Sequence, residues 1–241
     1  MGETKNPNTD NLKKAESRGQ ICENLSFAAK EAFKRLRANV TMAFPENELE
    51  CKIIGVTSAQ PSEGKSTVSL NLSFSLAELG KKVLLLDADM RRPSIHVKVG
   101  INKTPGLSNL LRTSNAIAAT IRNYKSTKNN TAFDIIPGGD VVQNPSELLG
   151  SKRMDTLLHA LASAYDYIII DLPPVGAVID AVTVSKKTDG MLVVIRENNC
   201  PRGVFSDCID QLKRTDINIL GFVVNGALEG AGKKYQYSNY Y

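Results

Sequence analysis

The chain alternates short, uniformly apolar runs with longer stretches in which apolar residues recur at helical spacing. Short apolar runs are typical of strands buried on both faces of a sheet. They predict strands at residues 52–57, 82–87, 133–137, 165–171, 190–196 and 219–225. Helices are predicted at residues 25–44, ending before a proline, and at 151–163, 180–186 and 201–215.

A further helix is predicted between the first two strands, beginning near Lys65 and capped by Gly80. Its apolar residues fall three or four positions apart on one predicted face, at Val68, Leu72, Leu76 and Leu79. A connection that contains such a helix is long enough to join two parallel strands through a right-handed crossover. The pattern therefore predicts an α/β fold with a doubly wound, mostly parallel sheet and helices on both faces. Ligands of such sheets bind at the carboxyl ends of the strands.

Composition narrows the class of protein. The chain has 241 residues, 42% of them hydrophobic, which suits a single core. No apolar run approaches the roughly 18 residues that span a bilayer, and the N-terminus lacks a secretory apolar region. We therefore expect a cytoplasmic protein. Its cysteines, which include no C-x-x-C pair, are expected to be reduced at Cys22, Cys51, Cys200 and Cys208.

The charge of the chain is modest, at +5. Such a charge suits an anionic surface or no particular partner. No basic helix with interleaved aromatic residues is present, so we expect no nucleic-acid partner.

The stretch AQPSEGKST follows the first predicted strand and opens the next helix, which is the context of a phosphate-binding loop. Gly64 lets the backbone approach a phosphate, and Lys65 adds a positive charge beside the amides of the helix N-terminus. The hydroxyl of Ser66 is a candidate ligand of Mg²⁺. Ala59 stands where the usual pattern has its first glycine.

Carboxylates follow two other predicted strands. VLLLDADMRRP places Asp87 and Asp89 after the second strand, and YIIIDLPP places Asp171 after a later one. A lone aspartate in such a place is more often a helix cap than a ligand. Three of them beside a phosphate loop favour Mg²⁺, which takes one or two carboxylates together with nucleotide phosphates. Arg91 and Arg92 are either phosphate contacts or solvated or ion-paired side chains.

These three stretches together resemble the Walker A, A′ and B motifs of the bacterial protein-tyrosine kinases of capsule and exopolysaccharide synthesis. The resemblance runs from about residue 28 to the C-terminus, and DADMRRP is its most specific part. It implies a fold of the P-loop NTPase type that uses ATP and Mg²⁺. Two residues depart from the family pattern: Ser62 replaces an expected glycine, and Ala59 replaces the first Walker glycine.

The resemblance also implies roles for the site residues. The catalytic residues would be Lys65, Asp87 and Asp89, and one of the two aspartates would be the base that accepts the tyrosyl proton. The residues that hold Mg²⁺ would be Ser66, Asp89 and Asp171. The nucleotide-binding residues would lie in the loop, apart from Arg91 and Asn225. Asn225 is a weaker candidate, for contact with the adenine. The full set is Ser62, Glu63, Gly64, Lys65, Ser66, Thr67, Arg91 and Asn225.

The two ends of the chain carry further predictions. Residues 1–22 and 229–241 are predicted to be flexible, on either side of a kinase domain at 23–228. The last segment holds four tyrosines, at Tyr235, Tyr237, Tyr240 and Tyr241. They are either a chance or aggregation-prone cluster or, as the resemblance implies, phosphoacceptors.

The predicted N-terminal helix resembles the family's E-x-x-R-x-x-R oligomerisation helix, with Glu31, Lys34 and Arg37 in its three places. The alternative is a solvated helix with an ordinary pair between Glu31 and Arg35. Lys34 replaces an arginine of the motif and loses its planar fork.

The resemblance implies partners as well. These are a homo-oligomeric ring, a membrane-embedded polysaccharide co-polymerase or chain-length regulator that activates the kinase at the inner face of the membrane, and a tyrosine phosphatase. The alternative function is that of a ParA- or MinD-like ATPase, a partitioning or positioning switch. Such ATPases carry a second lysine early in the loop, where this chain has Gln60. A nucleotide-sensing scaffold without chemistry is a third interpretation.

Overall fold

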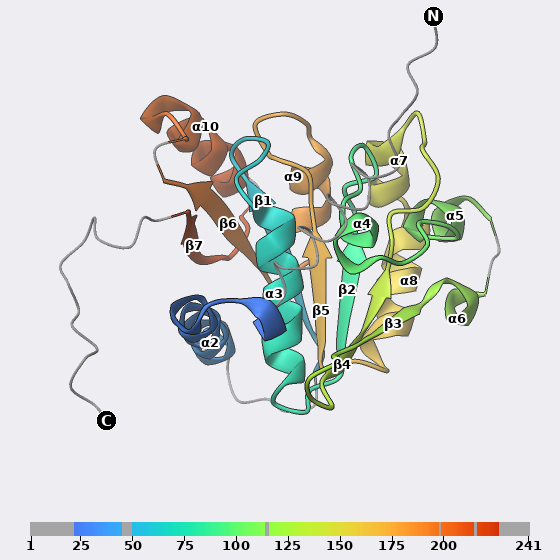
Figure 1. Ribbon diagram of the computed structural model, residues 1–241. Helices are drawn as coiled ribbons and strands as arrows, with labels where there is room; N and C mark the ends of the chain where they lie inside the picture. Colours follow the sequence, from blue (N-terminus) through green and yellow to red (C-terminus); the bar gives the residue numbers. More distant parts are fainter. Residues whose placement is uncertain (1–21, 45–49, 114–115, 198, 215, 227–241) are drawn as a thin grey trace, which may run out of the picture.

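The sheet at the centre of the molecule has the strand order β3-β4-β2-β5-β1-β6-β7 (Figure 1). The computed structural model describes residues 22–44, 50–113, 116–197, 199–214 and 216–226. The strands are β1 Lys52–Ser58, β2 Val83–Asp87, β3 Arg122–Lys125, β4 Ala132–Ile136, β5 Tyr167–Asp171, β6 Gly190–Arg196 and β7 Ile219–Asn225. All neighbouring pairs are parallel except β3 with β4. The predicted mostly parallel sheet is thus confirmed.

Helices cover both faces of this sheet, in agreement with the predicted doubly wound fold (Figure 1). One face packs against α2 and α3, and the other against α5, α8, α9 and α10. The helical segments are η1 Cys22–Asn24, α2 Phe27–Met42, α3 Lys65–Ala77, α4 Ile95–Val99, α5 Leu107–Arg112, α6 Ile117–Thr120, α7 Pro145–Gly150, α8 Lys152–Ala162, α9 Asp180–Ser185 and α10 Arg202–Lys213.

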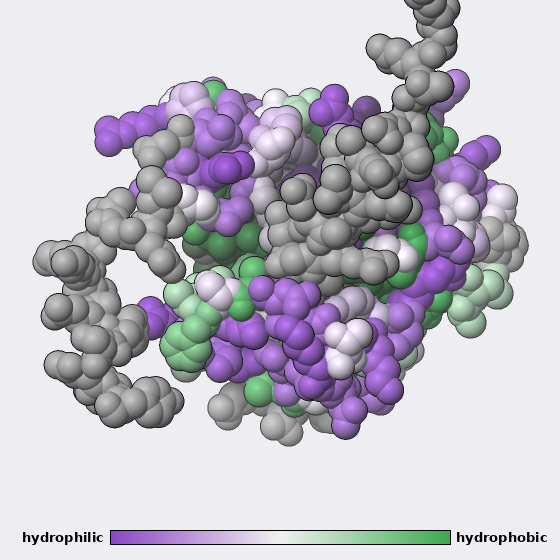
Figure 2. All heavy atoms as spheres, viewed as in Figure 1, coloured by the Kyte–Doolittle hydropathy of each residue, from purple (hydrophilic) through white to green (hydrophobic). Residues whose placement is uncertain are grey.

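The alternation of side chains along the strands divides the core into two layers. On β2, Leu84 and Leu86 join the layer of α8, whereas Val83 and Leu85 join the layer of α3. This is the period of two that a strand imposes. The face seen in Figure 2 is mainly hydrophilic, with apolar residues in separate smaller areas. The apolar runs of the sequence therefore build the inside of the sheet.

The structure corrects several sequence predictions. β3 was not predicted, because its sequence RNYK is polar and pairs only at the sheet edge; there Tyr124 stacks with Phe74 and Phe133. The helices α4 to α7 were not predicted either, since four to six residues carry too little periodicity. Leu79 lies beyond the end of α3 and is 57% exposed, so it does not belong to that helix's buried residues.

None of the helices in the described parts of the chain is long and apolar enough to cross a membrane. The two predicted flexible ends lie almost entirely outside the described residues, and so do the four tail tyrosines.

Candidate active site

The predicted phosphate loop connects β1 to α3 at the carboxyl edge of the sheet. Gly64 has a φ of 95° and precedes the first turn of α3. A Cβ atom at Gly64 would lie 1.9 Å from Nδ2 of Asn225, a distance that no side chain tolerates. The same Nδ2 donates a hydrogen bond to the carbonyl oxygen of Glu63 at 2.9 Å. The loop is thus seated against the end of β7, and only glycine fits at this position.

Side chains inside the loop hold its first half. The Ser58 hydroxyl donates to the Gln60 carbonyl at 2.8 Å, and the Gln60 N–H donates to Oε2 of Glu63 at 2.9 Å. Glu63 is completely buried, and its Oε1 atom has no hydrogen-bond partner in the structure. Ser62, where the resemblance leads one to expect glycine, has a φ of 66°. This left-handed conformation is strained for serine.

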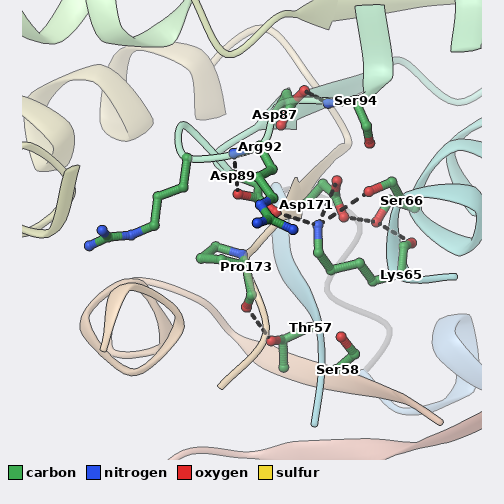
Figure 3. A network of polar contacts seen from close by, with 12 residues as sticks. Thr57, Ser58, Lys65, Ser66, Asp87, Asp89, Arg92, Ser94, Asp171 and Pro173 are labelled. Atoms are coloured by element: carbon green, nitrogen blue, oxygen red, sulfur yellow. Dashed lines mark hydrogen bonds and ion pairs between the residues drawn. The ribbon is translucent and has the colours of Figure 1, made fainter. Parts of the chain in front are cut away.

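Lys65 lies at the centre of a group of oxygen atoms (Figure 3). Its Nζ is 2.8 Å from Oδ2 of Asp89, 3.2 Å from Oγ of Ser66 and 3.5 Å from Oδ2 of Asp171. These are the three residues predicted to hold Mg²⁺. Their oxygens converge on one cation, and hard oxygens in this number suit Mg²⁺. The donor set therefore fits the metal that the sequence predicts.

The carboxylates of the site belong to adjacent strands. Asp87 ends β2 and Asp171 ends β5, and the two are direct neighbours in the parallel register. Burial raises the pKa of Asp87 well above its ordinary value, and the charge of Asp171 raises it further. Burial also raises the pKa of Asp171, while Lys65 opposes the shift. Two buried like charges thus depend on Lys65 for compensation.

Lys65 is strongly held as a cation in return. Burial by itself lowers its pKa, but the carboxylates of Asp171 and Asp89 outweigh burial and raise the pKa overall. In the described part of the chain no three histidine, cysteine or acidic side chains form a preformed metal cage.

The oxygen group opens into a cavity of about 870 Å³. Its walls include the phosphate loop, the Asp89–Ser94 loop, the two prolines after β5 and the end of β7. This volume is in the range of small-molecule and cofactor sites. Asp89 lines the cavity, whereas Asp87 is fully buried, and its Oδ1 atom has no hydrogen-bond partner among the described residues.

Comparisons with known proteins agree with this geometry. A family model described as an AAA domain matches residues 51–218. The tyrosine-protein kinase YwqD of Bacillus subtilis is 32% identical over 207 residues, which are 86% of this chain and 85% of YwqD. This chain belongs to the bacterial tyrosine-protein kinases. The kinase domain of the Escherichia coli tyrosine kinase ETK superposes on this member with a TM-score of 0.77 at 34% identity, covering 86% of this chain and 79% of the other.

A more distant likeness concerns the fold alone. Cobyrinic acid a,c-diamide synthase of Mycobacterium smegmatis, solved with an ATP analogue and magnesium, is 18% identical with a TM-score of 0.58. It covers 74% of this chain, which covers 72% of it. The relatives therefore favour the kinase over the partitioning ATPase. At Gln60, the place of that ATPase's second lysine, the structure shows a backbone contact with Glu63.

The two arginines of DADMRRP have different surroundings in this tyrosine-protein kinase. The Arg91 guanidinium donates to both carboxylate oxygens of Asp180, at 2.8 and 3.1 Å, and to the Ser146 hydroxyl at 3.3 Å. This ion pair is the alternative left open for Arg91, and a direct phosphate contact by this residue stays a prediction. The Arg92 N–H donates to Oδ1 of Asp89 at 3.0 Å, which closes the turn (Figure 3).

The predicted oligomerisation residues lie on α2 but do not act alike. Lys34 forms an ion pair with Glu31 at 2.8 Å on the exposed side of the helix. The alternative pair of Glu31 with Arg35 stays a prediction. Arg37 is turned toward α3, where its guanidinium donates to the carbonyl and hydroxyl oxygens of Ser75 at 2.7 and 3.2 Å. In the isolated chain Arg37 therefore joins α2 to the kinase core.

Motif reasoning missed two members of the site, Asp180 and Lys98, and it missed the structural roles of Glu63 and Asp87. The side chain of Glu63 ties the loop together, and Asp180 at the start of α9 fixes Arg91. Lys98 of α4 enters the cavity and donates to the Thr67 hydroxyl at 3.2 Å. Asp87 accepts the N–H groups of Ser94 and Ile95 at the start of α4, each at 3.2 Å. Only a tertiary structure brings these residues together, since no sequence spacing links them.

Proposed function

We propose that this chain transfers the γ-phosphoryl group of Mg·ATP to tyrosines near its own C-terminus, in neighbouring subunits. The carrying observation is the convergence of Asp89, Ser66 and Asp171 on Lys65 inside a nucleotide-sized cavity. Membership of the tyrosine-protein kinases supports the acceptor. The acceptor residues are Tyr235, Tyr237, Tyr240 and Tyr241, which lie outside the described residues.

Phosphoryl transfer needs positioning and charge stabilisation more than covalent help. Mg²⁺ supplies charge neutralisation on the phosphates, and Ser66, Asp89 and Asp171 would hold it. Lys65, whose Nζ lies among these oxygens, would place its ammonium on the phosphates. The loop amides around Gly64 donate to the same oxygens.

The remaining step is removal of the tyrosyl proton. Asp87 and Asp89 are both close enough to the oxygen group to serve as its acceptor. Asp89 already lines the cavity, whereas Asp87 lies behind it with an unpartnered Oδ1 atom. Replacing each by asparagine in turn and following the rate against pH distinguishes the two, since only loss of the base removes the limb on the acidic side of the profile, where the base becomes protonated.

A direct test is incubation of the purified chain with labelled Mg·ATP, followed by phosphosite mapping. Phosphotyrosine within residues 235–241 is expected. Release of phosphate without protein labelling would instead favour the ATPase function and contradict the proposal.

We further propose that a ring of subunits docks each tail in its neighbour, and that phosphorylation disperses the ring. Each phosphotyrosine adds about −1.5 to −2 charges at neutral pH, so four sites add about −6 to −8 to a chain of +5. Tails of this charge would repel Asp89 and its neighbours. Glu31 and Lys34 lie on the exposed side of α2 and are available for the ring contact.

The arrangement of α2 sharpens the test. Replacing Glu31, Lys34 and Arg37 by alanine is expected to give a monomer that binds nucleotide but phosphorylates itself poorly. Because Arg37 also binds Ser75 within the chain, the double variant with Arg37 retained is the matched control. Light scattering on unmodified, phosphorylated and variant proteins measures the effect. One unchanged mass across all of them would contradict the ring.

The activator proposed for this kinase is a membrane-embedded polysaccharide co-polymerase or chain-length regulator, with a tyrosine phosphatase as its counterpart. The cytoplasmic segment of such an activator is expected to speed a slow isolated kinase by stabilising the nucleotide-bound site. It would also bring the cytoplasmic chain to the inner face of the membrane. Full activity of the chain alone, unchanged by the segment, would contradict this part of the proposal.

A further inference from the structure

A second lysine, beside the end of the phosphate loop, lines the proposed nucleotide cavity. Lys98 lies on α4, and its Nζ donates to the hydroxyl of Thr67 at 3.2 Å. Both residues line the same cavity as Lys65. Lys98 belongs to none of the three motifs that define the site, because it stands six residues after Arg92 on a helix too short to be seen in the sequence.

The position of α4 is fixed by the site itself. Oδ2 of Asp87 accepts the N–H groups of Ser94 and Ile95, and the N–H of Lys98 donates to the Ser94 carbonyl at 3.2 Å. The lysine is therefore carried on a turn anchored to a buried carboxylate. Its stem is half-buried, so its ammonium is directed at Thr67 rather than into bulk water.

The position of Thr67 in the phosphate loop indicates which phosphates it would lie beside. In phosphate loops the lysine reaches the β- and γ-phosphates and the serine that follows it holds the metal between them, while the amides cradle the α- and β-phosphates. Lys65 and Ser66 occupy the first two roles in the proposed function. Thr67 comes next in the first turn of α3, beside the amides that by the same rule cradle the α- and β-phosphates.

Lys98 is a partly buried cation, and partial burial of a charge favours an oppositely charged partner. Burial lowers the pKa of Lys98 and Lys65 lowers it further, while Asp171 opposes them. A cation that is partly desolvated beside another cation gains when a phosphate takes the place of a neutral hydroxyl as its partner. Two lysines thus line one cavity, Lys65 in the phosphate loop and Lys98 on α4.

We propose that Lys98 binds the phosphates on the nucleoside side of the bound nucleotide, where it complements Lys65 at the transferred end. This inference rests on the proposed use of Mg·ATP, and it assigns to Lys98 a contact that the phosphate loop does not itself provide. It follows that Lys98 contributes equally to ATP and ADP, whereas Lys65 contributes more to ATP.

Calorimetric titration with ATP, ADP and adenosine, in Mg²⁺ at fixed ionic strength, tests this assignment. Lys98→Met is expected to weaken ATP and ADP by the same factor, about 10- to 100-fold, as for a lost bond to a charged group. Adenosine affinity should not change. Lys98→Arg should restore most of the loss, because it keeps the charge. Lys213→Met on the exposed last turn of α10 is the control for net charge.

The outcomes separate the inference from the proposed function. Wild-type protein that binds neither nucleotide would overturn both. Unchanged ATP and ADP affinities in Lys98→Met, beside a large loss in Lys65→Met, would overturn only the inference. Equal losses for all three ligands with a lowered melting temperature would show a structural tie to Thr67. Poor autophosphorylation with unchanged nucleotide affinity would overturn the inference and move Lys98 to acceptor docking.

Discussion

Aspartates occur at both ends of the strands, and the two ends use them in opposite ways. At the amino ends, Asp166 accepts the N–H of Lys82 at 2.7 Å and Asp189 accepts the N–H of Ile53 at 2.7 Å, each partner standing at the start of a neighbouring strand. These carboxylates are partly or fully exposed to water. Such charge-assisted bonds close the ends of the sheet at little cost in desolvation.

At the carboxyl ends the aspartates are buried beside one another. Asp87 and Asp171 are adjacent in register, Asp89 follows, and Lys65 is the cation that compensates them. One oxygen of Asp87 has no partner, and a strained Ser62 lies nearby in the phosphate loop. Aspartate thus stabilises the amino edge of the sheet. At the carboxyl edge its burial costs folding free energy, and such backbone strain and poorly compensated charge are typical of functional sites.

The largest expected effect comes from removing the compensating cation. Lys65→Met should lower tyrosine phosphorylation by about 10³-fold, because a positioned charge at the transferred phosphoryl group is lost. The protein should still fold, since Lys65 lies at the rim of the cavity and not in either apolar layer. Single-turnover labelling with Mg·ATP measures the rate, and circular dichroism confirms the fold. A rate near that of the wild type would refute the role of Lys65.

A second comparison exchanges a carboxylate at each edge. Asp87→Asn removes a buried charge while its side-chain oxygen still accepts from α4, so the free energy of unfolding at pH 7 should rise by about 1–2 kcal/mol and phosphorylation should fall. Asp166→Ala removes a bond to a backbone N–H, so stability should fall by about 1 kcal/mol with the rate unchanged. Urea unfolding in Mg²⁺-free buffer gives both values. Changes of the same sign would remove the contrast between the edges.

The sequence predicts the two edges unequally well. The apolar runs that become β1, β2 and β5 predict the sheet, and a sheet brings the aspartates after these runs to one edge. By contrast, Lys98 enters the cavity because Asp87 anchors α4, and Arg91 forms an ion pair because Asp180 is near in space. β3 is held by pairing and by the stacking of Tyr124, so its polar sequence carries no strand pattern. Contacts between segments distant in sequence decide these features.

The smallest expected effect isolates backbone strain in the phosphate loop. Ser62 has a φ of 66°, and Gly80, at the amino end of β2, has a φ of 76° with no atom within 4 Å of where its Cβ would lie. Ser62→Gly should raise the free energy of unfolding by about 0.5–1 kcal/mol, because relief of left-handed strain exceeds the added entropy of glycine in the unfolded chain. Gly80→Ser makes the reverse change in open space, so it should cost about 1 kcal/mol. Thermal unfolding of both variants, with and without Mg·ADP, provides the measurement.

If the gain in stability of Ser62→Gly disappears when nucleotide is bound, the ligand relieves the strain at Ser62. If the gain persists unchanged, serine is merely tolerated there. A loss of stability in Ser62→Gly would show that the hydroxyl stabilises the loop by more than its conformation costs, and the contrast between the edges would then rest on the carboxylates alone.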